Sequence, residues 1–124
     1  MWPQSPNGVH SIRLLRLEAL LKTYSTLTAL ELRLNKIEDN GTYPLLEVLE
    51  TNLTLTTLEL RNNMIRDNGA HAPSQALKTN SSLITLSSGS NKIGDNGAQE
   101  LGLALKANST LTTLDLTANL IGEI

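Results

Sequence analysis

Residues 55–65 read LTTLELRNNMI, and the spacing of leucine, asparagine and isoleucine in this stretch recurs on both sides of it. The step between successive copies is 28 residues. The matching positions are Leu27, Leu30, Leu32, Asn35 and Ile37, then Leu83, Leu86, Asn91 and Ile93, and finally Leu111, Leu114, Leu116, Asn119 and Ile121. An Asp-Asn-Gly phrase also recurs, beginning at positions 39, 67 and 95, and a helix-like segment follows each copy. A fixed period of roughly 20 to 50 residues is typical of a solenoid of stacked repeats.

The pattern L-x-x-L-x-L-x-x-N-x-I, in a helix-bearing unit of 28 residues, resembles a leucine-rich repeat. The phrase DNGA followed by L-x-x-A-L-K-x-N, from Asp95 to Asn108, is similar to the ribonuclease-inhibitor-like class. This resemblance implies an α/β solenoid shaped as a horseshoe arc, with short parallel strands on the concave face and helices on the convex face. Members of the class are usually protein-binding modules. The ribonuclease inhibitors themselves are cysteine-rich with alternating repeat types, whereas this chain has no cysteine and one repeat type, so their particular activity is not implied.

The repeat predicts one domain over residues 1–124, with full repeats at 25–52, 53–80 and 81–108 and a truncated repeat at 109–124. Residues 1–24 are expected to form a partial repeat that caps the N-terminal end. Trp2 stands at the position of the first strand leucine there, Pro3 and Pro6 block further strand pairing, and a helix is expected over residues 12–22. No similar cap is evident at the C-terminal end. We therefore expect a longer parent protein, self-association through that edge, or poor solubility.

Composition excludes several classes of function. The net charge of −2, with the two signs interspersed, and the three aromatic residues argue against nucleic-acid binding. We find no apolar run long enough to span a membrane and no secretory signal, and with no cysteine a reducing cytoplasmic location is expected. Asn-x-Ser/Thr triplets begin at Asn40, Asn52, Asn80 and Asn108. Because three of them fall at one point in the repeat, where asparagine can end a helix, a structural role is favoured over glycosylation.

The convex segments are expected to differ from one another. One helix should begin near Tyr43 or Pro44 and run to about Thr51. Pro73 is expected to start a short helix that ends near Thr79, because a proline inside a helix costs about 3 kcal/mol. The third helix should cover residues 97–107. The glycines of the Asp-Asn-Gly phrases are interpreted as turn residues with positive φ. Ser88 replaces a strand leucine, so the third repeat is expected to be the least stable.

Alternate residues of each strand should point inward, as leucines, and outward, onto the concave face. The outward residues form three predicted columns across the repeats. We expect a protein partner, of an identity that the sequence does not give, to bind these columns. They comprise Ala29, Thr57, Thr85 and Thr113; then Glu31, Glu59, Ser87 and Asp115; then Arg33, Arg61, Gly89 and Thr117. Arg33 and Arg61 are expected to lie within reach of Glu31 and Glu59 in a small patch of mixed charge.

We find no motif for catalysis, cofactor binding or metal binding, so a non-catalytic scaffold that binds protein is predicted. His10 and His71 lie far apart in the sequence, and His71 is expected on the surface of a convex turn. An open, solvated sheet offers nothing to separate the pKa values of the concave carboxylates for acid–base chemistry. One alternative is a segment of a larger regulatory protein similar to NOD-like receptors or Ran GTPase-activating proteins, by analogy of fold only. Another is a degenerate fragment without independent function.

Overall fold

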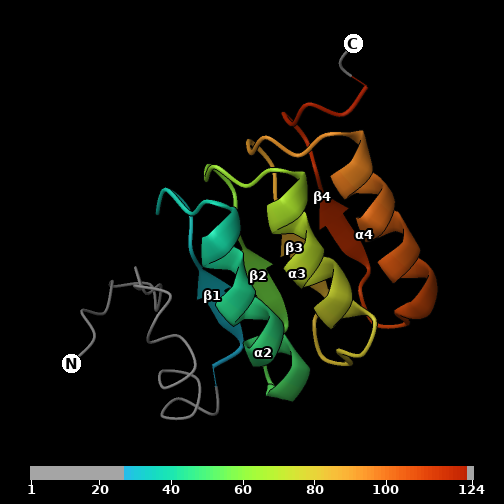
Figure 1. Ribbon diagram of the computed structural model, residues 1–124. Helices are drawn as coiled ribbons and strands as arrows, with labels where there is room; N and C mark the ends of the chain where they lie inside the picture. The colour runs from blue at the N-terminus through green and yellow to red at the C-terminus, as the bar shows by residue number, and fades with distance from the viewer. Residues whose placement is uncertain (1–26, 123–124) are drawn as a thin grey trace.

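The computed structural model describes residues 27–122 and shows a single four-stranded parallel sheet backed by helices (Figure 1). The strands are β1 (Ala29–Glu31), β2 (Thr57–Glu59), β3 (Thr85–Ser87) and β4 (Thr113–Asp115), and they lie side by side in chain order. Equivalent residues pair at a spacing of 28, so that Leu30 is opposite Leu58 and Leu58 is opposite Leu86. The predicted α/β solenoid with parallel strands is therefore confirmed. The predicted N-terminal cap and the helix over residues 12–22 lie outside the described residues.

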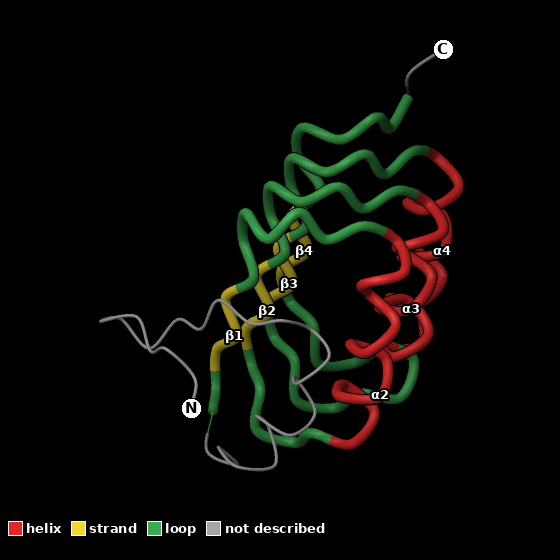
Figure 2. The backbone as a smooth tube through the Cα atoms, turned by 60° about the vertical axis from the view of Figure 1, so that its left-hand side comes forward, coloured by secondary structure: helices red, strands yellow, loops and turns green. Residues whose placement is uncertain are grey.

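The helices form one layer of the molecule and the strands form the opposite layer, with loops joining the two (Figure 2). They are the short 3-10 helix η2 (Asp39–Thr42), α2 (Tyr43–Thr51), α3 (Asp67–Leu77) and α4 (Asp95–Ala107). The bounds of α2 agree with the prediction, and α4 begins two residues earlier than expected. Within residues 27–122, every helix is too short or too polar to cross a lipid bilayer.

The leucines of the repeat form the core between these two layers. Leu30, Leu58 and Leu86, the middle residues of the first three strands, are almost completely buried, and Leu114 packs against them at the last strand. Since alternate residues of a strand face opposite sides, the flanking polar residues lie on the outer face of the sheet. We keep the name concave face for this surface, which points away from the helices.

A ladder of asparagines, at the recurring asparagine position of the repeat, joins neighbouring repeats. In each interior case the side-chain oxygen accepts hydrogen bonds from backbone N–H groups of the preceding repeat, and the side-chain nitrogen donates to carbonyls of both repeats. Asn63 and Asn91 are buried in this role, and Asn119 repeats it at the last strand. These amides satisfy backbone groups that neither a strand nor a helix satisfies.

A second asparagine ladder explains three of the four Asn-x-Ser/Thr triplets. Asn80 accepts hydrogen bonds from the N–H groups of Ser82 and Leu83 and donates to the carbonyl of Leu49 in the preceding repeat. The same contacts within the repeat are made by Asn52 and by Asn108. The position therefore closes the turn after each helix, which supports the structural reading of these triplets over glycosylation.

The prediction that Pro73 starts a short helix is wrong, because α3 begins at Asp67 and contains Pro73 in its interior. Proline has no N–H to donate to the carbonyl four residues earlier, so this helix lacks one backbone hydrogen bond. Burial along its whole inner side offsets that loss: Ala70, Ala72, Ala76 and Leu77 are almost fully buried. Packing against α2 and α4 therefore decides the helix bounds here, rather than the local preference of proline.

The interpretation of the Asp-Asn-Gly glycines is also wrong. Gly69 and Gly97 lie in the first turns of α3 and α4, and neither has a positive φ. Glycine is needed at these positions because the packing is close. A Cβ atom on Gly97 would lie 2.7 Å from Oδ1 of Asp67 and 2.8 Å from Cγ2 of Ile93. Asp67 needs this space because its Oδ1 accepts hydrogen bonds from the N–H groups of Gly94 and Gly97, at 2.6 and 3.0 Å.

Positive φ occurs instead immediately before each ladder asparagine. Leu34, Asn62, Ser90 and Ala118 have φ values of 59°, 57°, 52° and 56°. This residue lies three positions after each strand ends, and only asparagine among the four residue types favours the left-handed conformation. The signal was hidden in the sequence because four different residue types occupy the position.

We expect Ser88→Leu to stabilise the protein by about 1 kcal/mol, as cavity-filling substitutions toward a repeat consensus commonly do. Ser88 is buried directly after β3, at a position that leucine holds directly after the other three strands, and within residues 27–122 its hydroxyl makes no hydrogen bond. Burial of an unpaired hydroxyl is unfavourable, and leucine restores the apolar contacts. Urea unfolding of the two proteins measures the change. An unchanged or lower midpoint would mean that the neighbouring side chains have already closed over the smaller residue.

Candidate functional site

The concave face carries the predicted columns of outward side chains. Strand pairing places Ala29, Thr57, Thr85 and Thr113 side by side, and it does the same for Glu31, Glu59, Ser87 and Asp115. The third predicted column continues beyond the strand ends. A Cβ atom on Gly89 would lie 3.1 Å from the Thr117 hydroxyl and 3.6 Å from Cδ of Arg61, so these three residues are neighbours. The structure thus brings together the residues that the sequence analysis selected.

Each arginine of the concave face is held by the glutamate two residues before it. Nε of Arg33 lies 3.1 Å from Glu31, and Nε of Arg61 lies 3.0 Å from Glu59. The same carboxylates accept hydrogen bonds from the backbone N–H groups of their arginines, at 2.8 and 2.9 Å. The hydrogen bond and the charge of Glu59 raise the pKa of Arg61 above its usual value. These contacts orient two guanidinium groups that remain partly exposed and available to a partner.

We expect the carboxylate of Asp115 to titrate below the ordinary aspartate range. The backbone hydrogen bond from the Thr117 N–H is the main cause of its lowered pKa, and the Thr117 hydroxyl and the charge of Arg61 lower the pKa further. The folded pKa is lower than the unfolded one. The group therefore contributes stability above its unfolded pKa, and that contribution is lost as the pH falls through the folded pKa.

An NMR titration of the Asp115 carboxyl carbon measures this pKa. Thr117→Val removes the hydroxyl but keeps the N–H, so the midpoint should rise only partly toward the ordinary value. A complete return to the ordinary value would show that the hydroxyl, and not the backbone, is the dominant donor.

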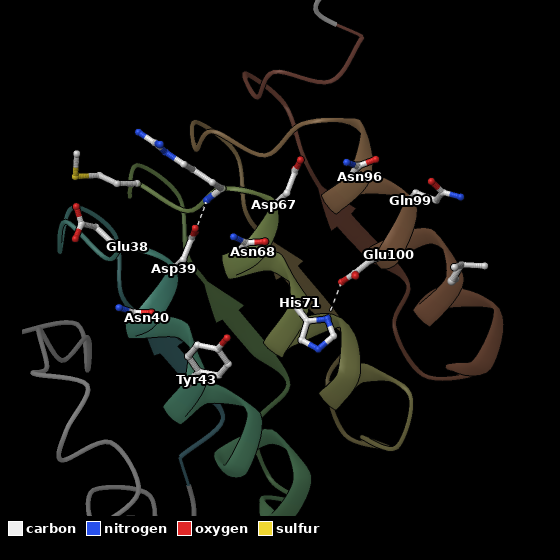
Figure 3. A pocket seen from close by; sticks show the side chains of 13 residues that line it. Glu38, Asp39, Asn40, Tyr43, Asp67, Asn68, His71, Asn96, Gln99 and Glu100 are labelled. Carbon is white, nitrogen blue, oxygen red and sulfur yellow. Dashed lines mark hydrogen bonds and ion pairs between the residues drawn. The ribbon is translucent and has the colours of Figure 1, made fainter.

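The helical side carries a groove that the sequence analysis missed (Figure 3). It has a volume of about 1000 Å³ and crosses α2, α3 and α4, mostly over their N-terminal halves but as far as Leu103 on α4. Tyr43 comes from α2, His71 from α3 and Glu100 from α4, while the loops before the helices add Glu38 and Met64. His71 lies in a helix rather than in the expected turn, and its Nδ1 is 3.0 Å from Oε2 of Glu100. Within residues 27–122, no three acidic or histidine side chains converge as a metal site.

One signal for this groove was present in the sequence. The middle residue of each Asp-Asn-Gly phrase, namely Asn40, Asn68 or Asn96, is exposed in every repeat and lines the groove. This polar residue recurs at an exposed position, whereas the aspartate and glycine beside it serve packing. Such a pattern indicates a second repeated surface, on the helical side of the solenoid. The other lining residues are spread over three helices, and only the fold shows that they are neighbours.

The model of the Leucine Rich repeat family matches residues 25–46, 51–72, 79–102 and 107–122. No curated protein matches significantly in sequence. Among solved structures, actin-binding site 2 of leiomodin-1 is similar, with a TM-score of 0.76 and 26% sequence identity over 86% of this chain and 61% of that one. The tropomodulin C-terminal domain of Caenorhabditis elegans has a TM-score of 0.70 and 17% identity, over 83% of this chain and 60% of that one.

The second of these likenesses concerns the fold alone, and the chain spans about three fifths of the length of both structures. The helix-backed parallel sheet is consistent with the ribonuclease-inhibitor-like class. Four matches to the family model cover more than half of the residues, and the leucine and asparagine ladders occupy the same positions in successive repeats. The protein belongs to the leucine-rich repeat family.

Proposed function

We propose that this chain is a non-catalytic module that binds a protein partner through its concave face. The supporting observation is the row of Arg33 and Arg61, each fixed by the glutamate two residues before it, on a face that also carries a column of exposed or half-exposed threonines beyond those glutamates. Arginines with preset orientation bind carboxylates of a partner with little loss of side-chain entropy. Threonine hydroxyls add donors and acceptors for the partner's polar groups.

Actin is the partner that we propose to test first. Leiomodin-1 actin-binding site 2 shares 26% identity over 86% of the present chain, and its name states that it binds actin. The concave face has few aromatic anchors, so an affinity in the micromolar range is expected of this chain alone.

The test compares two double variants of the full chain in binding to purified, fluorescently labelled monomeric actin. Arg33→Ala with Arg61→Ala should weaken binding about tenfold, because two oriented cations are lost from the concave face. The matched control, Lys92→Ala with Lys106→Ala, removes the same charge from exposed positions outside it and should change the affinity less than twofold.

Equal weakening by both variants would contradict the concave face as the binding surface. Absence of binding by the unaltered chain would exclude actin. In that case the same two variants are tested against proteins that crosslink to the chain. The concave face is rejected as the binding surface if the arginine variant weakens their binding no more than the lysine variant does.

A further inference from the structure

The groove over α2, α3 and α4 carries an excess of negative charge. Glu38, Asp39, Asp67 and Glu100 line it, and Arg66 is the single arginine or lysine among the lining residues. Its other ionisable groups are Tyr43 and His71, and His71 contacts Glu100. A groove whose charges are mostly of one sign concentrates ligands of the opposite sign.

Within residues 27–122, these carboxylates are only partly used. There Asp39 and Asp67 accept backbone hydrogen bonds through Oδ1 alone, from the N–H of Arg66 and from the N–H groups of Gly94 and Gly97 respectively. The side chain of Glu38 is exposed, and its carboxylate makes no hydrogen bond or ion pair with any of residues 27–122. The fold therefore fixes two of the acids and leaves their second oxygens available to an incoming cation.

Large apolar side chains stand among the acids. Tyr43, Met64 and Leu103 line the groove and are 53%, 39% and 52% exposed. Tyr43 and Leu103 come from the two outer helices, α2 and α4, so the apolar contacts lie toward both ends of the groove. A ligand that carries apolar groups as well as positive charge would cover them, and a Lys or Arg side chain can also stack on the tyrosine ring.

The remaining lining residues suit a peptide main chain. Asn40, Asn68 and Asn96 repeat across the groove, and each carboxamide offers both donors and an acceptor. Packed helices are separated by about 8 to 10 Å, so crossing three of them covers roughly 16 to 20 Å. An extended chain spans that distance in about six residues.

We propose that this groove binds an extended, basic segment of a partner protein, about six residues long, in which lysine or arginine alternates with one or two apolar side chains. This inference does not depend on the concave face, because the groove lies on the helical side. The carboxylates receive the basic side chains, and Tyr43 and Leu103 receive the apolar ones.

The test uses the full chain and an amidated, fluorescein-labelled nonapeptide of four lysines, two leucines and three glycines. Binding is followed by fluorescence anisotropy and by backbone amide shifts in NMR spectra. The shifts should gather around Asn40, Asn68 and Asn96. Replacing the lysines of the peptide with glutamate should abolish binding, and replacing its leucines with glycine should weaken binding several-fold.

Glu38→Gln with Glu100→Gln should weaken binding of the basic peptide about tenfold, since two exposed charge pairs are lost and the side-chain shapes are kept. The matched control is Glu31→Gln with Glu59→Gln, which removes the same charge from the concave face and should change the affinity less than twofold. Three results would each overturn the proposal: equal weakening by the two variants, equal affinity of the peptides with and without leucine, or amide shifts confined to the strands. Any of them would mean that the chain attracts cations without a specific site in the groove.

Discussion

Replacing Asn63 by alanine is expected to lower the free energy of unfolding by about 3 to 5 kcal/mol, because one buried side chain serves several backbone groups. Its Oδ1 accepts hydrogen bonds from the N–H groups of Asn35 and Ile37, both at 3.0 Å. Its Nδ2 donates to the carbonyls of Leu32 and Leu60, at 3.0 and 2.9 Å. The side chain is 7% exposed, so water cannot readily replace these partners. Since small domains have stabilities of about 5 to 15 kcal/mol, this loss is a large share of the total.

Urea unfolding followed by circular dichroism measures the effect, and loss of cooperative unfolding at 25 °C would also meet the expectation. Asn119→Ala is the matched control within the same ladder. Asn119 is only half-buried, so water can replace part of its contacts. Its Nδ2 also donates to two carbonyls, those of Ser88 and Leu116, but its Oδ1 accepts from one N–H, that of Ile93, instead of two. Its replacement should cost about 1 kcal/mol. Similar losses for the two variants, or a loss below 1 kcal/mol for Asn63→Ala, would contradict the role of the ladder as the main junction between repeats.

The repeat period made the strands, the leucine core and the asparagine ladder predictable. Three independent requirements, namely inward leucines, a turn after each strand and satisfied backbone groups, recur at the same spacing in each repeat. A single substitution such as Ser88 does not hide that pattern. The outward columns of the concave face follow from the same alternation, and so does the proximity of Arg61 to Glu59. Their role in binding a partner stays a prediction.

Predictions from the sequence were wrong where a residue has both a local preference and a tertiary role. Pro73 favours a helix start, yet packing against two neighbouring helices extends α3 on both sides of it. Gly69 and Gly97 favour positive φ, yet their position is set by the aspartate of the preceding repeat. Neither competing contact is visible within one repeat. The aspartate that packs on each glycine lies 30 residues earlier, and α3 packs against the helices of both neighbouring repeats. The groove was missed for the same reason, since its lining is shared by three repeats.

The second large effect concerns the glycine that ends each Asp-Asn-Gly phrase. Gly97→Ala is expected to lower the free energy of unfolding by about 2 to 3 kcal/mol, the cost of overpacking a filled site. The new Cβ atom would meet Oδ1 of Asp67 at 2.7 Å and Cα of the same residue at 3.2 Å. Asp67 cannot move aside without losing its hydrogen bonds to Gly94 and Gly97. The substitution therefore disturbs the junction between two repeats as well as the local packing.

Gly102→Ala provides the matched control, because it makes the same chemical change in the same helix. No atom lies within 4 Å of a Cβ at this position, which is exposed in the interior of α4. Alanine should stabilise the helix there by about 0.5 to 1 kcal/mol, since glycine loses more backbone entropy on folding. The two variants should thus shift the urea midpoint in opposite directions. A midpoint for Gly97→Ala at or above that of the unaltered protein would show that Asp67 can shift at little cost in free energy. Close packing against the preceding repeat would then not be the reason for glycine at this position.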